Sequence, residues 1–254
     1  MKKQIPNTIT LMNFLCGVLS IVALLLWKQP LLASVFIICG ALFDFCDGLT
    51  ARALKVSGAI GKELDSLADV VSFGVAPSLI ATSLLLENKS NYEFLNYLGG
   101  FVCYIPLFMA IMSCYRLAKF NIDERQSLSF IGLPTPANAI VWLSIPIINH
   151  LHTNNIHLWG INSDELHSFL FSTMNNPYFI LIISIILAIL LVSELPLFSL
   201  KFKKLTWQGN EIKFIFLICA FFMLVLLGLY SMPLIIILYI LLSIIENIVK
   251  KSTI

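Results

Sequence analysis

Residues 214–245 read FIFLICAFFMLVLLGLYSMPLIIILYILLSII, a run of 32 residues without one charged side chain. As a single helix this run would be about 48 Å long, whereas the hydrocarbon core of a bilayer is about 30 Å thick. We therefore expect two membrane-spanning helices that meet near Ser231, Met232 and Pro233, because Gly228 and Pro233 both interrupt helices readily. A chain that carries such a run is an integral membrane protein.

The composition of the whole chain supports this class. Of the 254 residues 59% are hydrophobic and only 12% are charged, whereas soluble domains carry about 25% charged residues. The net charge of +2 gives no basic surface of the kind that binds nucleic acid, and no nucleic-acid partner is expected. The length suits one membrane domain over residues 1–254 and leaves no room for a second globular domain.

Six further apolar stretches are long enough, or nearly so, to cross a membrane. They are residues 8–27, 29–43, 70–86, 94–115, 131–148 and 177–193. Together with the pair in the long C-terminal run, they predict an all-α, polytopic membrane helix bundle of about eight transmembrane helices. We expect the first span to be retained rather than cleaved, because no small-residue cleavage pattern follows it.

Basic residues test this topology, because cytoplasmic loops are enriched in lysine and arginine. With eight spans and an inside amino terminus, all of the 16 basic residues except Lys28 and Lys89 fall in inside segments. These inside residues are Lys2, Lys3, Arg52, Lys55, Lys62, Arg116, Lys119, Arg125, Lys201, Lys203, Lys204, Lys213, Lys250 and Lys251. The distribution predicts that both termini are cytoplasmic.

Cysteines and histidines do not indicate a metal site. The six cysteines are scattered through or beside the predicted spans without a C-x-x-C pair, so we expect neither a disulfide framework nor a thiolate site. The four histidines lie in the longest predicted outer loop, roughly residues 150–176, and none are spaced to share a helical face. They are His150, His152, His157 and His167, and we expect them at the surface.

Aspartates are concentrated in two short stretches beside predicted spans. Residues 44–52 read DFCDGLTAR and residues 61–69 read GKELDSLAD. In each stretch two aspartates lie three or four residues apart, which places both on one helical face. A turn at residues 58–61 would let the two faces oppose each other near the cytoplasmic surface. The aspartates are Asp44, Asp47, Asp65 and Asp69.

Four carboxylates that converge in this way repel one another unless a proton or a cation intervenes. Hard oxygen ligands suit Mg²⁺ or Mn²⁺, and the number of ligands leaves room for two ions that would serve phosphate chemistry. Gly48 and Ala51 would let a phosphorylated group approach the helix, and Arg52 is a fixed cation able to bind phosphate. The alternative is that the small residues only allow helices to pack closely.

These residues resemble a known family. The pattern D-x2-D-G-x2-A-R-x8-G-x3-D-x3-D, which runs from Asp44 to Asp69, is similar at every fixed position to the signature of the CDP-alcohol phosphatidyltransferases. The resemblance implies a membrane enzyme that displaces CMP from a CDP-linked lipid by an alcohol, with divalent metal. It also implies that all four aspartates hold the metal ions and that Asp69 is the general base. The residues that it implies for the CDP site are Asp47, Gly48, Ala51, Arg52 and Gly61.

Three flanking stretches resemble the bacterial members of that family that use L-serine as acceptor and CDP-diacylglycerol as donor. They are IPNT at residues 5–8, SFGVAPS at 72–78, and RLAKFN at 116–121 followed by FIGLPTP at 130–136. Phosphatidylserine and CMP would be the products. The resemblance further implies a multi-pass protein of the bacterial inner membrane, an active site that faces the cytoplasm, and a homodimer.

Other residues and other functions stay open. Arg116 and Lys119 either hold the serine carboxylate or a lipid phosphate, or only anchor the cytoplasmic membrane surface. Asn7 and Asn13 either reach a nucleotide or make polar helix contacts. The acceptor could instead be glycerol 3-phosphate or an inositol compound. A cation-coupled transporter is the alternative outside the family, since aspartates inside a membrane also mark ion pathways.

Overall fold

The computed structural model describes residues 4–56, 58–122, 130–156, 164–198, 206–207 and 210–252. Helices account for nearly all of them. The elements are α1 (Gln4–Leu25), α2 (Pro30–Ala53), α3 (Ala59–Asp69), η1 (Val70–Val75), α4 (Ala76–Glu87), η2 (Glu93–Leu107), α5 (Phe108–Ile122), β1 (Phe130–Ile131), α6 (Thr135–Thr153), α7 (Asp164–Met174), α8 (Pro177–Val192), β2 (Pro196–Leu197), α9 (Glu211–Leu227), η4 (Gly228–Ser231) and α10 (Met232–Ser252).

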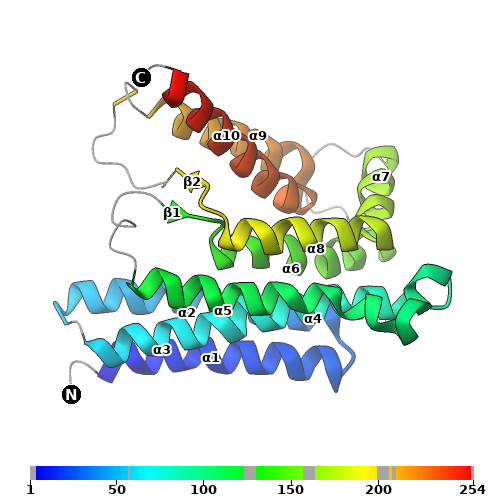
Figure 1. Ribbon diagram of the computed structural model, residues 1–254, viewed down its shortest axis with the longest axis horizontal. Coiled ribbons are helices and arrows are strands. Elements are labelled where there is room, and N and C mark those ends of the chain that lie inside the picture. Colours follow the sequence, from blue (N-terminus) through cyan, green and yellow to red (C-terminus); the bar gives the residue numbers. More distant parts are fainter. Residues whose placement is uncertain are drawn as a thin grey trace.

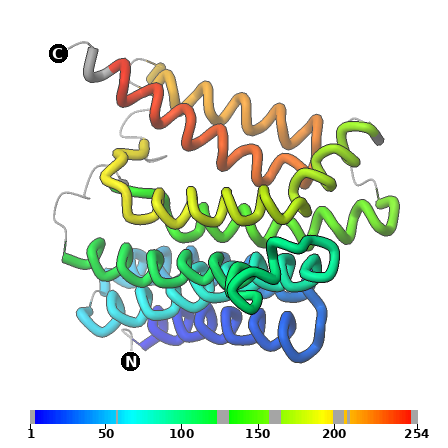
Figure 2. Tube along the Cα trace, turned by 45° about the vertical axis from the view of Figure 1, so that its right-hand side comes forward, coloured from blue at the N-terminus to red at the C-terminus, as the bar shows by residue number. Residues whose placement is uncertain are grey.

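The helices form a layered bundle in which successive long helices run in alternating directions (Figure 1). Helices α1 to α5 form one layer, α6 and α8 lie on it, and α9 and α10 lie side by side beyond them (Figure 2). A continuous cluster of buried apolar side chains joins the layers, with Trp142 of α6 among its largest members. The predicted all-α helix bundle is therefore confirmed.

The chain is a multi-pass membrane protein. Five helical stretches of the described residues are long and apolar enough to cross a membrane, and a sixth is added if α7 and α8, bent by 66°, form one span. Residues 211–249 form one of the five. The helix breaks at η4 (Gly228–Ser231), where Gly228 has a φ of 57°, so the break predicted near Ser231, with Gly228 as one of its breakers, is confirmed. The count of eight spans stays a prediction.

Several helix limits differ from the sequence prediction for local reasons. Helix α2 continues to Ala53, past the apolar stretch that ends at Phe43, and carries Asp44 and Asp47 on its inner turns as the sequence predicts. The predicted span 94–115 begins as a kinked 3-10 segment with left-handed residues at 98–100 and continues as α5 to Ile122. An apolar run shows which part of a helix lies in the membrane core. The helix itself can be longer, because its backbone hydrogen bonds continue outside the core.

The described parts of the predicted outer loop at residues 150–176 are largely helical. His150 and His152 lie in the last turns of α6, and His167 lies on α7, where it is 6% exposed and stacks on Tyr230 with ring centroids 4.2 Å apart. The expected surface position is therefore wrong for His167, because the ring packs against Tyr230 in the bend between α9 and α10. His157 lies outside the described residues. All six cysteines are free.

Candidate functional site

The four signature aspartates come from two neighbouring helices. Asp44 and Asp47 lie on the inner half of α2, and Asp65 and Asp69 lie on α3. One carboxylate oxygen each from Asp44, Asp47 and Asp65 lies within 4.8 Å of the others. The spacing of three and four residues therefore places the pairs on facing sides, as the sequence predicts.

Asp69 lies deeper than this group of three. The residue is 9% exposed, and it interacts electrostatically with the other three aspartates. Its Oδ1 accepts a hydrogen bond of 3.2 Å from Nδ2 of Asn13. The four carboxylates thus form one cluster, in which Asp69 occupies the buried end.

Helix α1 supports this cluster from the side. Thr10 donates a hydrogen bond of 2.5 Å to Oδ2 of Asp47, and Asn13 holds Asp69. These two residues are three positions apart and therefore share one face of α1. Asn13 was predicted either to reach a nucleotide or to make a polar contact between helices, and in the structure it makes the polar contact, with Asp69.

Glycines allow α1 to come close enough for these bonds. A Cβ atom at Gly17 would lie 2.5 Å from Oγ of Ser72 and 2.9 Å from its Cα and N, so no larger residue fits without moving the backbone of η1. Ser72 in turn donates a hydrogen bond of 2.9 Å to the Asn13 carbonyl. A Cβ atom at Gly40 would lie 2.9 Å from Oδ1 of Asn13. Close backbone packing thus fixes the register between α1 and the aspartates.

A π-helical segment follows directly after Asp69. Residues Val70–Val75 form η1, which continues without interruption into α4. Such π-helical turns are rare and occur most often at functional sites. Within η1, Gly74 packs against α5, because a Cβ atom there would lie 2.9 Å from Cβ of Ser113. The wider turn therefore lies where α1, α3 and α5 converge.

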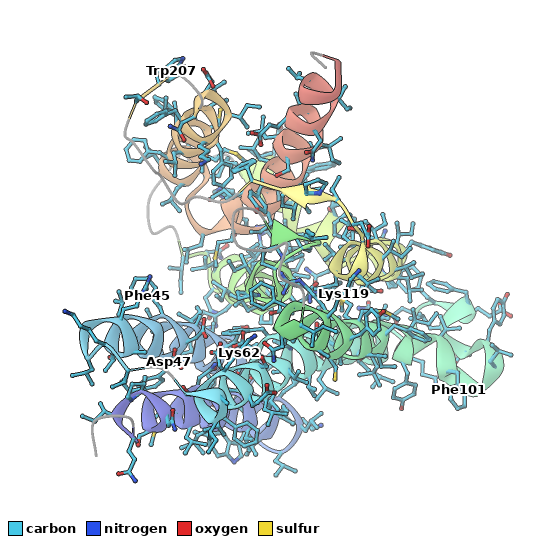
Figure 3. The ribbon with its side chains drawn as sticks, turned by 60° about the vertical axis from the view of Figure 1, so that its left-hand side comes forward. Phe45, Asp47, Lys62, Phe101, Lys119 and Trp207 are labelled. Carbon is cyan, nitrogen blue, oxygen red and sulfur yellow. The ribbon has the colours of Figure 1, made fainter. Side chains whose placement is uncertain are left out.

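A cavity of about 640 Å³ opens beside the aspartates, within the range of small-molecule sites. Figure 3 shows Asp47 on the side of α2 that faces α1 and α3, whereas Phe45 points away from it. The lining residues are Pro6, Asn7, Thr10, Asp47, Gly48, Ala51, Val56, Gly58, Ala59, Ile60, Gly61, Lys62 and Asp65. The cavity is therefore bounded by α1, α2 and α3.

The small residues of the signature leave this cavity open. Apart from the backbone of α2 itself, a Cβ atom added at Gly48 would meet only Nη2 of Arg52 among the described residues, at 4.0 Å. A Cβ atom at Gly61 would lie 3.1 Å from Oδ1 of Asn7. Arg52 is exposed and does not line the cavity, but its Nε donates a hydrogen bond of 3.0 Å to the Gly48 carbonyl. Gly48 therefore faces space rather than another helix, unlike a glycine that serves only close packing.

The two basic residues at the end of α5 differ in their surroundings. Arg116 is 7% exposed, its Nε has no hydrogen-bond partner within the described part of the chain, and it interacts electrostatically with Asp69. Lys119 forms an ion pair of 3.2 Å with Glu194, beside α8 (Figure 3). Anchoring at the membrane surface does not explain why the Arg116 guanidinium is buried. The charge of Lys119 is already paired with that of Glu194.

The structure corrects the predicted turn and adds residues to the site. The turn precedes Ala59, where α3 begins, so Gly61 belongs to the first turn of α3 and not to the connection. Thr10 and Lys62 line the cavity but were not predicted as site residues. The sequence could have indicated Thr10, because it shares a helical face with Asn13. It could not have indicated Lys62, which resembles an ordinary basic residue at a cytoplasmic helix end.

Comparisons with known proteins agree with the signature. The family model described as CDP-alcohol phosphatidyltransferase matches residues 3–163. A protein of Bacillus subtilis named CDP-diacylglycerol–serine O-phosphatidyltransferase is 42% identical over 132 residues, which cover 52% of this chain and 69% of that protein. A Helicobacter pylori protein of the same name is 30% identical over 207 residues, 80% of this chain and 74% of the relative. A Saccharomyces cerevisiae protein of that name is 36% identical over 157 residues, 56% of this chain and 53% of the relative.

Proposed function

The chain belongs to the CDP-alcohol phosphatidyltransferase family, and on that premise we propose that it transfers the phosphatidyl group of CDP-diacylglycerol to the hydroxyl of L-serine. Phosphatidylserine and CMP are the products. The observation that carries the proposal is the cluster of four aspartates at the edge of a cavity of about 640 Å³. The choice of serine is supported by relatives of that name, among them the Bacillus subtilis protein.

We assign a divalent metal site, for Mg²⁺ or Mn²⁺, to the four aspartates. The cluster fits such ions, because three carboxylate oxygens lie within 4.8 Å of one another and the one ion pair among the described residues, Lys119–Glu194, does not involve them. Ions bound there would neutralise the pyrophosphate and the charge that develops on the departing CMP. The number of carboxylates suits two ions. The ligands are Asp44, Asp47, Asp65 and Asp69.

The cavity is assigned to the CDP group. Gly48, Ala51 and Gly61 line it, and their small size lets the nucleotide approach the helix backbones. Asp47 and Asp65 both line the cavity and belong to the group of three carboxylates, so the pyrophosphate would lie beside the cluster. Arg52, fixed by its bond to the Gly48 carbonyl, would hold phosphate oxygens from the exposed side.

Asp69 is assigned as the general base. The serine hydroxyl attacks the phosphorus that is bonded to diacylglycerol, a new P–O bond forms, and the hydroxyl proton passes to Asp69. The P–O bond to CMP breaks, and its electron pair leaves with CMP. Nδ2 of Asn13 donates a hydrogen bond of 3.2 Å to Oδ1 of Asp69, so Oδ2 is the oxygen that would accept the proton.

Arg116 is assigned to the acceptor carboxylate. Its Nε has no hydrogen-bond partner among the described residues, and a buried charge that lacks hydrogen bonds is costly. The carboxylate of serine would supply hydrogen bonds assisted by charge. The electrostatic interaction between Arg116 and Asp69 supports an acceptor that lies between them. Lys119 serves at most a supporting role, because Glu194 already neutralises it.

We place the active site at the cytoplasmic face of the bacterial inner membrane. The helix ends that carry Arg52, Lys62, Lys119 and Lys213 lie at the same end of the bundle (Figure 1), as cytoplasmic basic residues do. The acyl chains of CDP-diacylglycerol would then remain in the bilayer. A homodimer stays a prediction made by analogy with the family.

An acceptor panel tests this function. Purified protein in detergent with CDP-diacylglycerol and Mn²⁺ or Mg²⁺ is expected to release CMP when serine is added, and not with glycerol 3-phosphate or inositol, because a single buried arginine matches one carboxylate. The rate of CMP release with each alcohol is the measurement. Release with glycerol 3-phosphate but not with serine would overturn the choice of acceptor, and release with no acceptor at all would indicate hydrolysis.

A further inference from the structure

The C-terminal hairpin is tied to the segment that follows α8. Tyr239 of α10 donates a hydrogen bond of 2.9 Å to the Phe198 carbonyl, and Asn247, two turns further along α10, donates one of 2.6 Å to the Pro196 carbonyl. The two bonds lie on either side of Leu197, which is buried. Helix α10 therefore holds β2 at two points.

Aromatic packing strengthens the first of these points. The Tyr239 ring meets Phe198 edge to face at 4.8 Å between centroids and Phe216 of α9 at 5.7 Å. Phe198 and Phe216 also contact each other, at 5.7 Å. All three side chains are buried. The Tyr239 hydroxyl is thus held in a fixed position by rings from three segments.

Strand β2 passes this constraint to the end of α8. Strand β2 pairs with β1. Gly132, the residue that follows β1, has a φ of 75°. A Cβ atom at Gly132 would lie 2.6 Å from the Leu191 carbonyl and 3.0 Å from that of Ser193. The backbone around Gly132 is therefore packed directly onto the last turn of α8, with no space for a side chain between them.

This packed segment forms one wall of the crevice that contains the buried arginine. The crevice is narrow, about 10 Å³ in volume, and is lined by Tyr115, Arg116, Lys119, Ile131, Leu191, Val192 and Ser193. Tyr239 also interacts electrostatically with Arg116. Figure 1 shows β1 and β2 between the hairpin and the rest of the bundle.

We propose that α10 is part of the acceptor site, with Tyr239 and Asn247 as positioning residues that hold β2 and β1 against α8 and so fix Arg116 toward the acceptor carboxylate. This inference rests on the proposed function of Arg116. The family match ends at residue 163, so α10 lies beyond it. The hairpin would then act in recognition of the acceptor and not only as a membrane anchor.

The substitution Tyr239→Phe tests this role, because it removes the hydroxyl and keeps the ring that packs against Phe198 and Phe216. The KM for serine is expected to rise roughly 5- to 10-fold, as for the loss of one hydrogen bond, while the KM for CDP-diacylglycerol stays unchanged. Tyr230→Phe is the matched control, since Tyr230 is also a buried tyrosine of the hairpin but lies against His167 of α7. It is expected to leave both KM values unchanged.

A second variant, Asn247→Ala, guards against a folding defect in the first, because Asn247 is only partly buried. It is expected to raise the KM for serine in the same selective way. An unchanged KM for serine in either folded variant, or an equal rise of both KM values, overturns the inference alone. Wild-type protein that releases no CMP with serine overturns the proposed function and this inference with it.

Discussion

The substitution Asp69→Asn is expected to lower kcat for CMP release by about 10²- to 10⁴-fold, the range attributed to a positioned general base. Asparagine has nearly the same shape and can still accept the bond from Asn13 at Oδ1, but it cannot take the serine proton. Because Asp69 lies at the buried end of the cluster, water does not readily replace it. Steady-state rates with saturating serine and CDP-diacylglycerol measure the effect.

Glu63→Gln is the control for this substitution. Glu63 lies on the same helix, α3, and is exposed, so the change removes one negative charge near the site without touching the cluster. Its kcat is expected to equal that of the wild type. An Asp69→Asn protein with normal turnover would contradict the assignment of the base, whereas equal losses in both variants would point to a general effect of charge on α3.

The second large effect is expected at Asp44, whose carboxylate lies within 4.8 Å of those of Asp47 and Asp65 and interacts electrostatically with Asp69. Asp44→Asn removes a central carboxylate, so divalent metal should bind much more weakly and CMP release should fall by at least about 10²-fold. The same change relieves repulsion between carboxylates. Without metal, the variant is therefore expected to unfold at a higher temperature than the wild type.

Thermal unfolding in detergent, with EDTA and with Mn²⁺, separates these effects from a folding defect. Mn²⁺ should raise the unfolding temperature of the wild type and of Glu63→Gln, because an ion that binds only the folded state stabilises it. It should have little effect on Asp44→Asn. If Mn²⁺ stabilises that variant as much as the wild type, Asp44 is not a metal ligand.

The sequence predicted the class of fold and the centre of the site for physical reasons. Long apolar runs identify membrane helices because the bilayer core has a fixed thickness. The spacing of the aspartates identifies their shared faces because helical geometry fixes which residues point the same way. Both signals are local, and the structure places Asp44, Asp47 and Asp65 together as they indicate.

Contacts between distant segments were not predictable in this way. The bond from Thr10 to Asp47 joins residues 37 positions apart, and its existence depends on the register between α1 and α2, which glycine packing sets. The π-helical turn after Asp69 leaves no mark in apolar periodicity. The buried state of Arg116 and the bond from Tyr239 to the Phe198 carbonyl depend on how distant segments pack, and the sequence shows only a basic residue at a helix end.

The most direct test of the account follows the oxygen of the acceptor. Purified protein is given CDP-diacylglycerol, divalent metal and L-serine that carries ¹⁸O in its hydroxyl group, and both products are analysed by mass spectrometry. Attack of the hydroxyl on the lipid phosphorus predicts one ¹⁸O atom in each phosphatidylserine and an equal amount of unlabelled CMP. Formation of CMP with phosphatidic acid instead of labelled phosphatidylserine, at a rate independent of serine, would contradict it.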